Sequence, residues 1–359
     1  MKVLVGLSGG VDSAVAAYLL KQSGHDVVGA TMSIWEKGHA FSGLTTADAC
    51  FSPHEEQDID AAREICKILD IPYHTLDCSE IYKKTVLENF KSEYLSGRTP
   101  NPCVWCNAKI KFKALPDAAE QAGINFDKFA TGHYARITFD EKSNRFRLRR
   151  GIDSKKDQSY FLYRLSQEQL GKILFPLGDK TKAEIREIAR VAGFPVSDKP
   201  DSQDFYSGDI NDILQADPKP GRFIMKDGTV MGTHNGFWNY TIGQRKGLGI
   251  SAPKPLYVIG FDKDNNDVIV GFEEENVCHY LTAGNLCWSE GEPPAASFAA
   301  VAKIRSSQPP TPVRVSLTAA DEIKIDFELN QRGVAPGQSV VLYDGDLILG
   351  GGIIKNSGK

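Results

Sequence analysis

No stretch of the sequence reaches the length of about 18 apolar residues that a membrane-spanning helix needs. The first ten residues, MKVLVGLSGG, lack the basic region, the long apolar core and the cleavage site of a secretory signal peptide. Neither sign of charge dominates, because 42 Lys and Arg face 46 Asp and Glu, which gives a net charge of −4 and a pI near 6.0. We therefore expect a cytoplasmic protein that makes no membrane contact.

The balance of charge and the cysteine count exclude little more. Many nucleic-acid-binding proteins are strongly basic, so the bulk charge gives no support to such a partner, although it allows a local basic surface. The seven cysteines are an odd number, and in a reducing compartment they do not indicate a disulfide framework. Only Cys103 and Cys106 lie close together in the sequence.

The 359 residues are enough for two or three domains with a sizeable core. In the first half, short apolar segments typical of buried strands alternate with helical patterns. The expected strands are 2–7, 27–33, 73–76 and 129–131, and the expected helices are 12–22, 55–69, a helix from residue 79, and 180–191. This alternation predicts an α/β domain, residues 1–205, with a parallel sheet covered on both faces.

After about residue 203, segments punctuated by Gly and Pro replace the helical patterns. The expected strands are 223–225, 227–228, 232–236, 257–261, 267–270, 301–305, 313–317, 323–328 and 340–343. We predict a small central β domain (206–282) and a C-terminal β-barrel-like domain (283–359). A hairpin is also expected at 134–150, where Arg145, Arg147 and Arg149 would share one face. That face fits either a strip of phosphate contacts or a charged edge that blocks strand pairing.

Residues 8–13 (SGGVDS) lie between the first strand and the first helix. Successive glycines let backbone N–H groups approach phosphate oxygens, and the helix N-terminus adds partial positive charge. Asp12 suits a site that holds Mg²⁺ together with pyrophosphate; a plain Gly-rich turn capped by Asp12 is the alternative. The segment is neither a Walker A loop nor a dinucleotide fingerprint. It resembles the PP-loop of the ATP pyrophosphatases, which cleave ATP between the α and β phosphates and adenylate an oxygen of their substrate.

Residues 97–107 (GRTPNPCVWCN) carry the close pair of cysteines behind two prolines, near the expected start of a helix. The helix N-terminus together with Lys109 and Lys111 predicts a lowered thiol pKa. A zinc knuckle would want a second Cys-x-x-Cys, which the sequence lacks. Incidental burial fits Cys66, in an amphipathic helix, better than this proline-bounded pair.

Seven blocks in order resemble, nearly end to end, the tRNA-specific 2-thiouridylases. They are residues 8–13, TPNPCVWCN at 99–107, ATGHYA at 130–135, KDQSY at 156–160, DSQ at 201–203, YTIGQRKGLG at 240–249 and PGQS at 336–339. The resemblance implies that ATP adenylates the C2 oxygen of wobble uridine 34 in tRNA. Sulfur then displaces AMP to give 2-thiouridine, with the sulfur coming from a donor protein or from a persulfide or sulfide source.

The resemblance also assigns residues to roles. ATP with Mg²⁺ would be held by Gly6, Leu7, Ser8, Gly9, Gly10, Val11, Asp12, Ser13, Met32 and Gly132. The tRNA would be touched by Asn101, Pro102, Cys103, His133, Lys156, Asp157, Gln158 and Gln338. Asp12, Cys103 and Cys106 would be catalytic.

Two departures from the family pattern affect the sulfur chemistry. The catalytic cysteine aligns with Cys106, and Cys103 replaces the usual Asp. The second catalytic cysteine is replaced by Tyr206, which cannot carry a persulfide. Cys103 and Cys106 could form the relay themselves, or Cys50 could join them as the third ligand of a [4Fe-4S] cluster whose open iron holds the incoming sulfur.

Two other functions would suit parts of the sequence. One is a PP-loop adenylating ligase or amidase acting on a small metabolite, which would have no use for the tRNA-side blocks or the β domains. The other is a tRNA-binding paralogue that has lost catalysis with the missing cysteine, against which the intact ATP loop argues.

Overall fold

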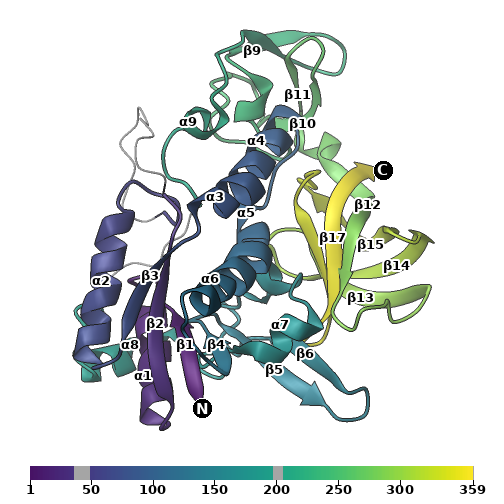
Figure 1. Cartoon of the computed structure of the whole chain (residues 1–359). Helices are drawn as coiled ribbons and strands as arrows, with labels where there is room; N and C mark the ends of the chain where they lie inside the picture. Colours follow the sequence, from purple (N-terminus) through teal and green to yellow (C-terminus); the bar gives the residue numbers. More distant parts are fainter. Residues whose placement is uncertain (36–48, 197–204, 359) are drawn as a thin grey trace.

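A five-stranded parallel sheet forms the centre of the N-terminal half, in the order β3-β2-β1-β4-β7 (Figure 1). The computed structural model describes residues 1–35, 49–196 and 205–358. The elements of this half are β1 (Lys2–Gly6), α1 (Val11–Gln22), β2 (Asp26–Ser33), α2 (Glu55–Ile68), β3 (Tyr73–Asp77), α3 (Ser79–Tyr82), η1 (Lys83–Leu87), α4 (Glu88–Leu95), α5 (Pro102–Trp105), η2 (Cys106–Ala114), α6 (Leu115–Gln121), β4 (Lys128–Ala130), β5 (Ala135–Asp140), β6 (Arg145–Arg150), η3 (Ser159–Leu162), α7 (Gln167–Lys172), β7 (Ile173–Leu174) and α8 (Lys182–Val191). The predicted α/β class is confirmed.

Alternate residues of β1 pack into the cores on the two faces of this sheet. Val3 and Val5 belong to one core, together with side chains of α1, α2 and α8. Leu4 belongs to the other core, which α3, α4 and the helices around the cysteine pair cover. Burial on both faces explains why this strand reads as a continuous apolar run. No helix in the described part of the chain is long and apolar enough to cross a membrane.

The helix that carries the cysteine pair changes from α-helical to π-helical hydrogen bonding at Cys106. One turn of α-helix, α5, is followed by the nine-residue π-helix η2 and then by α6. π-Helical hydrogen bonding is rare and often marks functional sites. The π-helical stretch therefore coincides with the second cysteine of the pair.

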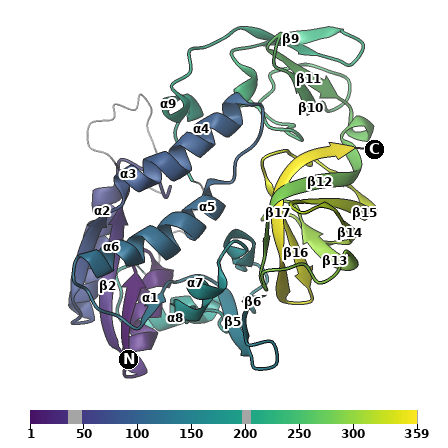
Figure 2. The ribbon, with the colours of Figure 1, turned by 45° about the vertical axis from the view of Figure 1, so that its right-hand side comes forward.

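The second half consists of two β units, as predicted (Figure 2). The central unit contains α9 (Ile210–Leu214), β8 (Gly221–Ile224), β9 (Val230–His234), η4 (Phe237–Asn239), β10 (Tyr257–Asp262), β11 (Asp267–Gly271) and η5 (Glu273–Glu275). Its sheet has the order β10-β11-β8-β9. The strand expected at 227–228 is wrong: Gly228 has a φ of +88° and lies in the turn that joins β8 to β9.

The C-terminal unit closes into a barrel because β12 pairs with both β15 and β17. Its strands are β12 (Val277–Trp288), β13 (Ser297–Lys303), β14 (Thr311–Ala319), β15 (Glu322–Arg332), β16 (Ser339–Asp344) and β17 (Leu347–Gly358). Because β12 begins at Val277, the barrel starts before residue 283, where the sequence placed its boundary.

The expected hairpin 134–150 exists as β5 and β6, but it does not stand alone. β6 pairs with β17 through Arg149 and Leu347, so the N-terminal half adds two strands to the sheet of the barrel. Arg136 and Arg149 both form ion pairs with Asp346. The C-terminal barrel is therefore joined to the N-terminal domain by backbone pairing and by charge.

Candidate active site

The loop of residues 8–13 follows β1 at the carboxyl edge of the parallel sheet, and its two serines are joined by hydrogen bonds. The backbone N–H of Ser8 donates to Ser13 Oγ at 3.2 Å, and Ser13 Oγ donates to the carbonyl of Gly10 at 3.1 Å. Gly10 is the N-cap of the twelve-residue helix α1. Ligands bind at this edge in open α/β sheets, so the loop presents a helix N-terminus and backbone N–H groups where an anion can bind.

Gly9 is required in this loop for two reasons. Its φ is +68°, in the left-handed region, and a Cβ there would come within 2.5 Å of the carbonyl oxygen of Asp58. Gly132, which follows β4, is similarly restricted, because its Cβ would lie 2.6 Å from the carbonyl carbon of Asp12. These two glycines let α2 and the chain after β4 pack directly against the loop.

The other predicted nucleotide residues gather at the same edge. Gly6 ends β1, and Leu7 follows it with its carbonyl accepting a hydrogen bond from Thr31 Oγ1 at 3.0 Å. Met32 is the next residue on β2. The structure thus brings Gly6, Leu7, the loop and Met32 to one end of two neighbouring parallel strands.

The Asp12 carboxylate contacts two side chains that lie far from it in the sequence, Lys182 and Tyr134. Lys182 Nζ contacts both carboxylate oxygens of Asp12, at 2.8 and 2.9 Å, and Tyr134 Oη donates to Asp12 Oδ1 at 2.8 Å. Lys182 lies 170 residues further along the chain, at the start of α8. Sequence reasoning missed this lysine, because only the fold brings it to the loop.

Cys103 and Cys106 lie half-buried at the start of the helix, as expected. The expectation of a lowered thiol pKa is wrong for Cys106. Burial raises the pKa of the Cys106 thiol to about 11, and the positive charge of Lys111 offsets only part of this effect. Desolvation of the thiol therefore outweighs the positive charge of Lys111.

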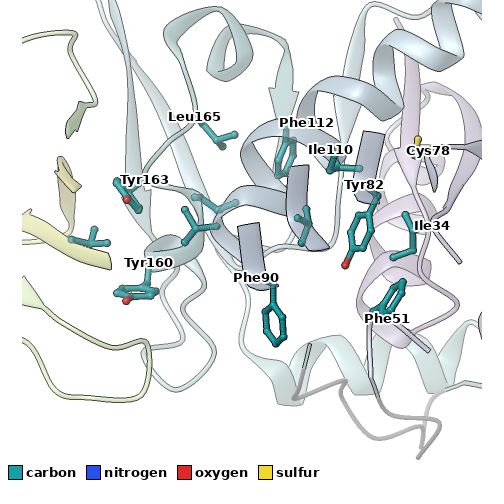
Figure 3. Packing of buried hydrophobic residues seen from close by; sticks show 14 of the residues in the cluster. Ile34, Phe51, Cys78, Tyr82, Phe90, Ile110, Phe112, Tyr160, Tyr163 and Leu165 are labelled. Carbon is teal, nitrogen blue, oxygen red and sulfur yellow. The ribbon is translucent and has the colours of Figure 1, made fainter. Parts of the chain in front are cut away.

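The three cysteines considered as sulfur carriers or cluster ligands all lie close enough to the buried phenol of Tyr82 to influence its pKa. Tyr82 is 1% exposed, and its pKa is raised first by burial and then by the negative charges that Cys106, Cys50 and Cys103 can carry. Cys50, which is exposed, precedes Phe51, whose ring stacks on Tyr82 at 5.6 Å (Figure 3). In the described residues, however, no three Cys, His, Asp or Glu side chains converge at metal-binding distances. The cysteines share a region, but they do not form a metal site in this geometry.

Tyr206, in place of the second cysteine, lies beside the same cluster. Its ring centroid is 6.3 Å from that of Phe51, and its hydroxyl donates to Asp212 Oδ2 at 2.9 Å. The backbone N–H of Phe51 donates to the carbonyl of Phe205 at 3.0 Å, so the segments of Cys50 and Tyr206 are paired. The DSQ block at 201–203 lies outside the described residues.

Two blocks far apart in sequence meet in front of the cysteine pair. Gln338 Nε2 donates to the carbonyl of Pro100 at 2.8 Å, and the N–H of Thr99 donates to the carbonyl of Pro336 at 2.8 Å. Asn101, the N-cap of α5, is buried beside Tyr160. The C-terminal barrel therefore holds the residues that lead into the cysteine pair.

The other predicted tRNA-contacting residues are more enclosed. His133 is 9% exposed, its Nδ1 lies 2.7 Å from Thr131 Oγ1, and burial lowers its pKa well below 6.5. The Asp157 carboxylate accepts from Arg150 Nε and from the backbone N–H groups of Gly151 and Ser159, and its side chain is 1% exposed. Gln158 Oε1 accepts from the N–H of Tyr134 at 3.0 Å. In this geometry Asp157 and Gln158 fix the turn on which Lys156 stands.

The hairpin arginines are largely paired within the chain. Besides the Arg149–Asp346 pair, Arg147 contacts Asp140 and Glu290. The interpretation of this face of the hairpin as a strip of phosphate contacts is therefore weakened, because Arg147 and Arg149 already have carboxylate partners. Next to the YTIGQRKGLG block, Arg245 and Lys254 line an open hollow of about 440 Å³.

A glycine-rich loop at the carboxyl edge of a parallel sheet, followed by two β units, defines a nucleotide-binding HUP-type domain with β appendages. Residues 1–206 match the family model described as tRNA methyl transferase HUP domain, residues 210–272 the tRNA methyl transferase PRC-barrel domain, and residues 278–354 the aminomethyltransferase beta-barrel domain.

Relatives match over almost the whole chain. The sequence is 49% identical to the tRNA-specific 2-thiouridylase MnmA of Endomicrobium trichonymphae, over 99% of both chains. It is 43% identical to MnmA 1 of Caldanaerobacter subterraneus subsp. tengcongensis, over 99% of this chain and 98% of that one. A solved 4-thiouridine synthetase–RNA complex with bound ATP has 18% identity and a TM-score of 0.35, over 60% of this chain and 45% of that chain. The chain belongs to the tRNA-specific 2-thiouridylase family, as its sequence blocks predicted.

Proposed function

We propose that the protein is an ATP-dependent tRNA sulfurtransferase that makes 2-thiouridine at wobble position 34. It would adenylate the C2 oxygen of the uridine, release pyrophosphate, and replace the activated oxygen with sulfur, releasing AMP. The observation that carries this proposal is the match to named 2-thiouridylases over 99% of their length, with an intact nucleotide loop and cysteine pair. A cytoplasmic location is part of the proposal.

The loop residues would bind the phosphates of ATP. The backbone N–H groups after Gly9 and at the N-terminus of α1 would donate to the phosphates. The hydroxyls of Ser8 and Ser13, whose oxygens lie 3.3 Å apart in the same loop, would add two more donors. The Asp12 carboxylate suits Mg²⁺, because this ion is bound through one or two carboxylates together with phosphate oxygens. In this structure both oxygens of Asp12 already face a cation, the Lys182 ammonium. Bound Mg²⁺ would offset the charge of the leaving pyrophosphate, and Asp12 would hold it.

Cys106 would carry the sulfur and Cys103 would release the product. In the first step, the terminal sulfur of a Cys106 persulfide attacks C2 and the C2–O bond breaks with loss of AMP. In the second, the Cys103 thiolate attacks Cys106 Sγ, the persulfide S–S bond breaks, and its electron pair leaves on the 2-thiouridine sulfur. The resulting Cys103–Cys106 disulfide is then reduced by a cellular thiol, which completes the balance.

The [4Fe-4S] alternative has weaker support from this geometry. The three cysteines surround Tyr82, yet the described residues contain no convergent set of three metal ligands. Iron and acid-labile sulfide analysis of anaerobically purified protein tests this alternative: a colourless, iron-free protein that still thiolates tRNA would exclude the cluster.

The tRNA would approach the cysteine pair past the C-terminal barrel. Asn101, Pro102 and Cys103 would line the target base, and Gln338 supports them through Pro100. Lys156, Gln158 and His133 would contribute to the tRNA side, with Asp157 fixing their turn through Arg150. A sulfur-donor protein or a small molecule that carries a persulfide would load Cys106: the Cys106 thiolate attacks the outer sulfur of the donor, which leaves as a thiol. Sulfide could load Cys106 only by opening the Cys103–Cys106 disulfide, which leaves Cys103 as a thiol.

The decisive test is mass spectrometry of wobble nucleosides from cells that lack the gene. Complementation with the wild type should restore 2-thiouridine, and complementation with Cys106→Ser should not. Unchanged 2-thiouridine after deletion, in a strain with no second copy, would contradict the proposal. In vitro, ATP–pyrophosphate exchange that proceeds without tRNA would point instead to a ligase for a small substrate.

A further inference from the structure

Lys182 is a largely buried cation of the nucleotide site that the sequence patterns did not predict. Its ammonium contacts both oxygens of Asp12, its side chain is only 11% exposed, and it lies 6.0 Å from the centroid of the Tyr134 ring. Asp12 is the one carboxylate inside the anion-binding loop. A carboxylate there repels phosphate unless a cation compensates its charge.

Hydrogen bonds at the start of α8 fix the backbone of Lys182. Thr181 caps α8 with a complete capping box to Glu184, and the N–H of Lys182 donates to Asp153 Oδ2 at 3.0 Å. The first residue of α8 is therefore fixed from both sides. Its long side chain spans the remaining distance to the loop.

The docking of α8 does not depend on this ion pair. Ile185 and Ala189 of α8 are fully buried in the same core as Ala14 of α1, and the Tyr18 ring meets Phe194 edge-on at 6.0 Å. Apolar burial is sufficient to hold the two helices together. The contact of Lys182 with Asp12 is therefore not what holds α8 in place.

We propose that Lys182 is a positioning residue of the nucleotide site, which fixes the Asp12 carboxylate and offsets its charge so that the phosphates of ATP can bind beside it. Mg²⁺ at Asp12 would supply the same compensation. Lys182 therefore matters most when the metal is absent. This inference rests on the proposed ATP-dependent function.

The test measures ATP affinity by calorimetry on the full chain, once with excess Mg²⁺ and once with EDTA. Lys182→Met keeps the length of the side chain and removes its charge. It should weaken ATP binding about tenfold or more in EDTA, because Asp12 is then uncompensated, and clearly less in Mg²⁺. Lys182→Arg should restore most of the loss. Lys172→Met, which removes an exposed lysine paired with Glu168, is the matched control and should change neither affinity.

A second background separates the proposal from a direct phosphate contact. In Asp12→Asn protein, Lys182→Met should cost little further affinity in EDTA, because no carboxylate remains to compensate. An equal loss in EDTA and Mg²⁺, or a full loss in the Asp12→Asn background, would mean that Lys182 binds phosphate itself and would overturn the proposal. A lower Tm with unchanged ATP affinity would also overturn it. Failure of the wild type to bind ATP would instead refute the proposed function.

Discussion

Gln338 and Pro100 are joined by a hydrogen bond across 238 residues of sequence, with Gln338 Nε2 donating to the carbonyl of Pro100 at 2.8 Å. The parallel contact from Thr99 to Pro336 makes this a two-point attachment. Pro100 lies three residues before Cys103. The C-terminal barrel therefore sets the position of the segment that delivers the cysteine pair.

Replacing Gln338 by Glu should weaken tRNA thiolation and leave ATP binding intact. The substitution removes the amide donor and brings a carboxylate up to a carbonyl oxygen. A lost hydrogen bond of about 1 kcal/mol corresponds to roughly fivefold, and repulsion adds to it. Steady-state thiolation with varied tRNA measures the effect. Gln331→Glu is a matched control, because Gln331 Nε2 also donates to a backbone carbonyl of the barrel, that of Leu329.

Serine replacements of single cysteines should separate the two sulfur routes. The relay predicts that Cys106→Ser and Cys103→Ser lose single-turnover thiolation, while Cys50→Ser retains most of it. Cys278→Ser, in the barrel beside Ser357, serves as the control. A brown, iron-containing wild type whose iron is lost in Cys50→Ser would favour the cluster and contradict the relay.

The reactivity of Cys106 should rise with pH without levelling off in the accessible range. Its thiol pKa is raised by burial to about 11, so the thiolate fraction grows about tenfold per pH unit between pH 7 and 9. Iodoacetamide labelling followed by peptide mass spectrometry measures this dependence, with Cys106→Ser as the blank. Lys111→Met should slow the labelling further, because Lys111 lowers this pKa. A plateau near pH 8 would contradict the predicted environment.

Gly9→Ala should abolish measurable ATP binding or unfold the loop. The new methyl group would approach the Asp58 carbonyl at 2.5 Å on a backbone with φ of +68°. Gly24→Ala separates the two causes, because Gly24 has φ of +77° with nothing within 4 Å of its Cβ. The control should cost about 1–2 kcal/mol of stability and keep ATP affinity. Calorimetric ATP titration with thermal unfolding measures both. Equal ATP affinity in the two variants would show that the Asp58 contact is unimportant.

The helices and strands that the sequence predicted best are those whose signals lie within a short stretch of residues. The strand–helix alternation around the loop and the hairpin at Arg145 were readable because periodicity and turn residues are local properties. The Lys182–Asp12 contact and the pairing of β6 with β17 could not be predicted from the sequence, since each joins residues at least 170 positions apart. The raised pKa of the Cys106 thiol could not be predicted for a related reason. Nearby lysines are visible in a sequence, whereas the burial that outweighs them arises only from the complete fold.

The pairing of β6 with β17 has a consequence for biosynthesis. Arg149 leaves the ribosome roughly 200 residues before its partner Leu347. During that interval the hairpin β5–β6 presents an unpaired strand edge to other nascent chains, which is a hazard for misassembly. The arginines on this edge, Arg145, Arg147 and Arg149, carry charge that discourages such encounters until Asp346 and β17 emerge. Arg149 would thus protect the nascent chain first and, through its ion pair with Asp346, join the hairpin to the finished barrel afterwards.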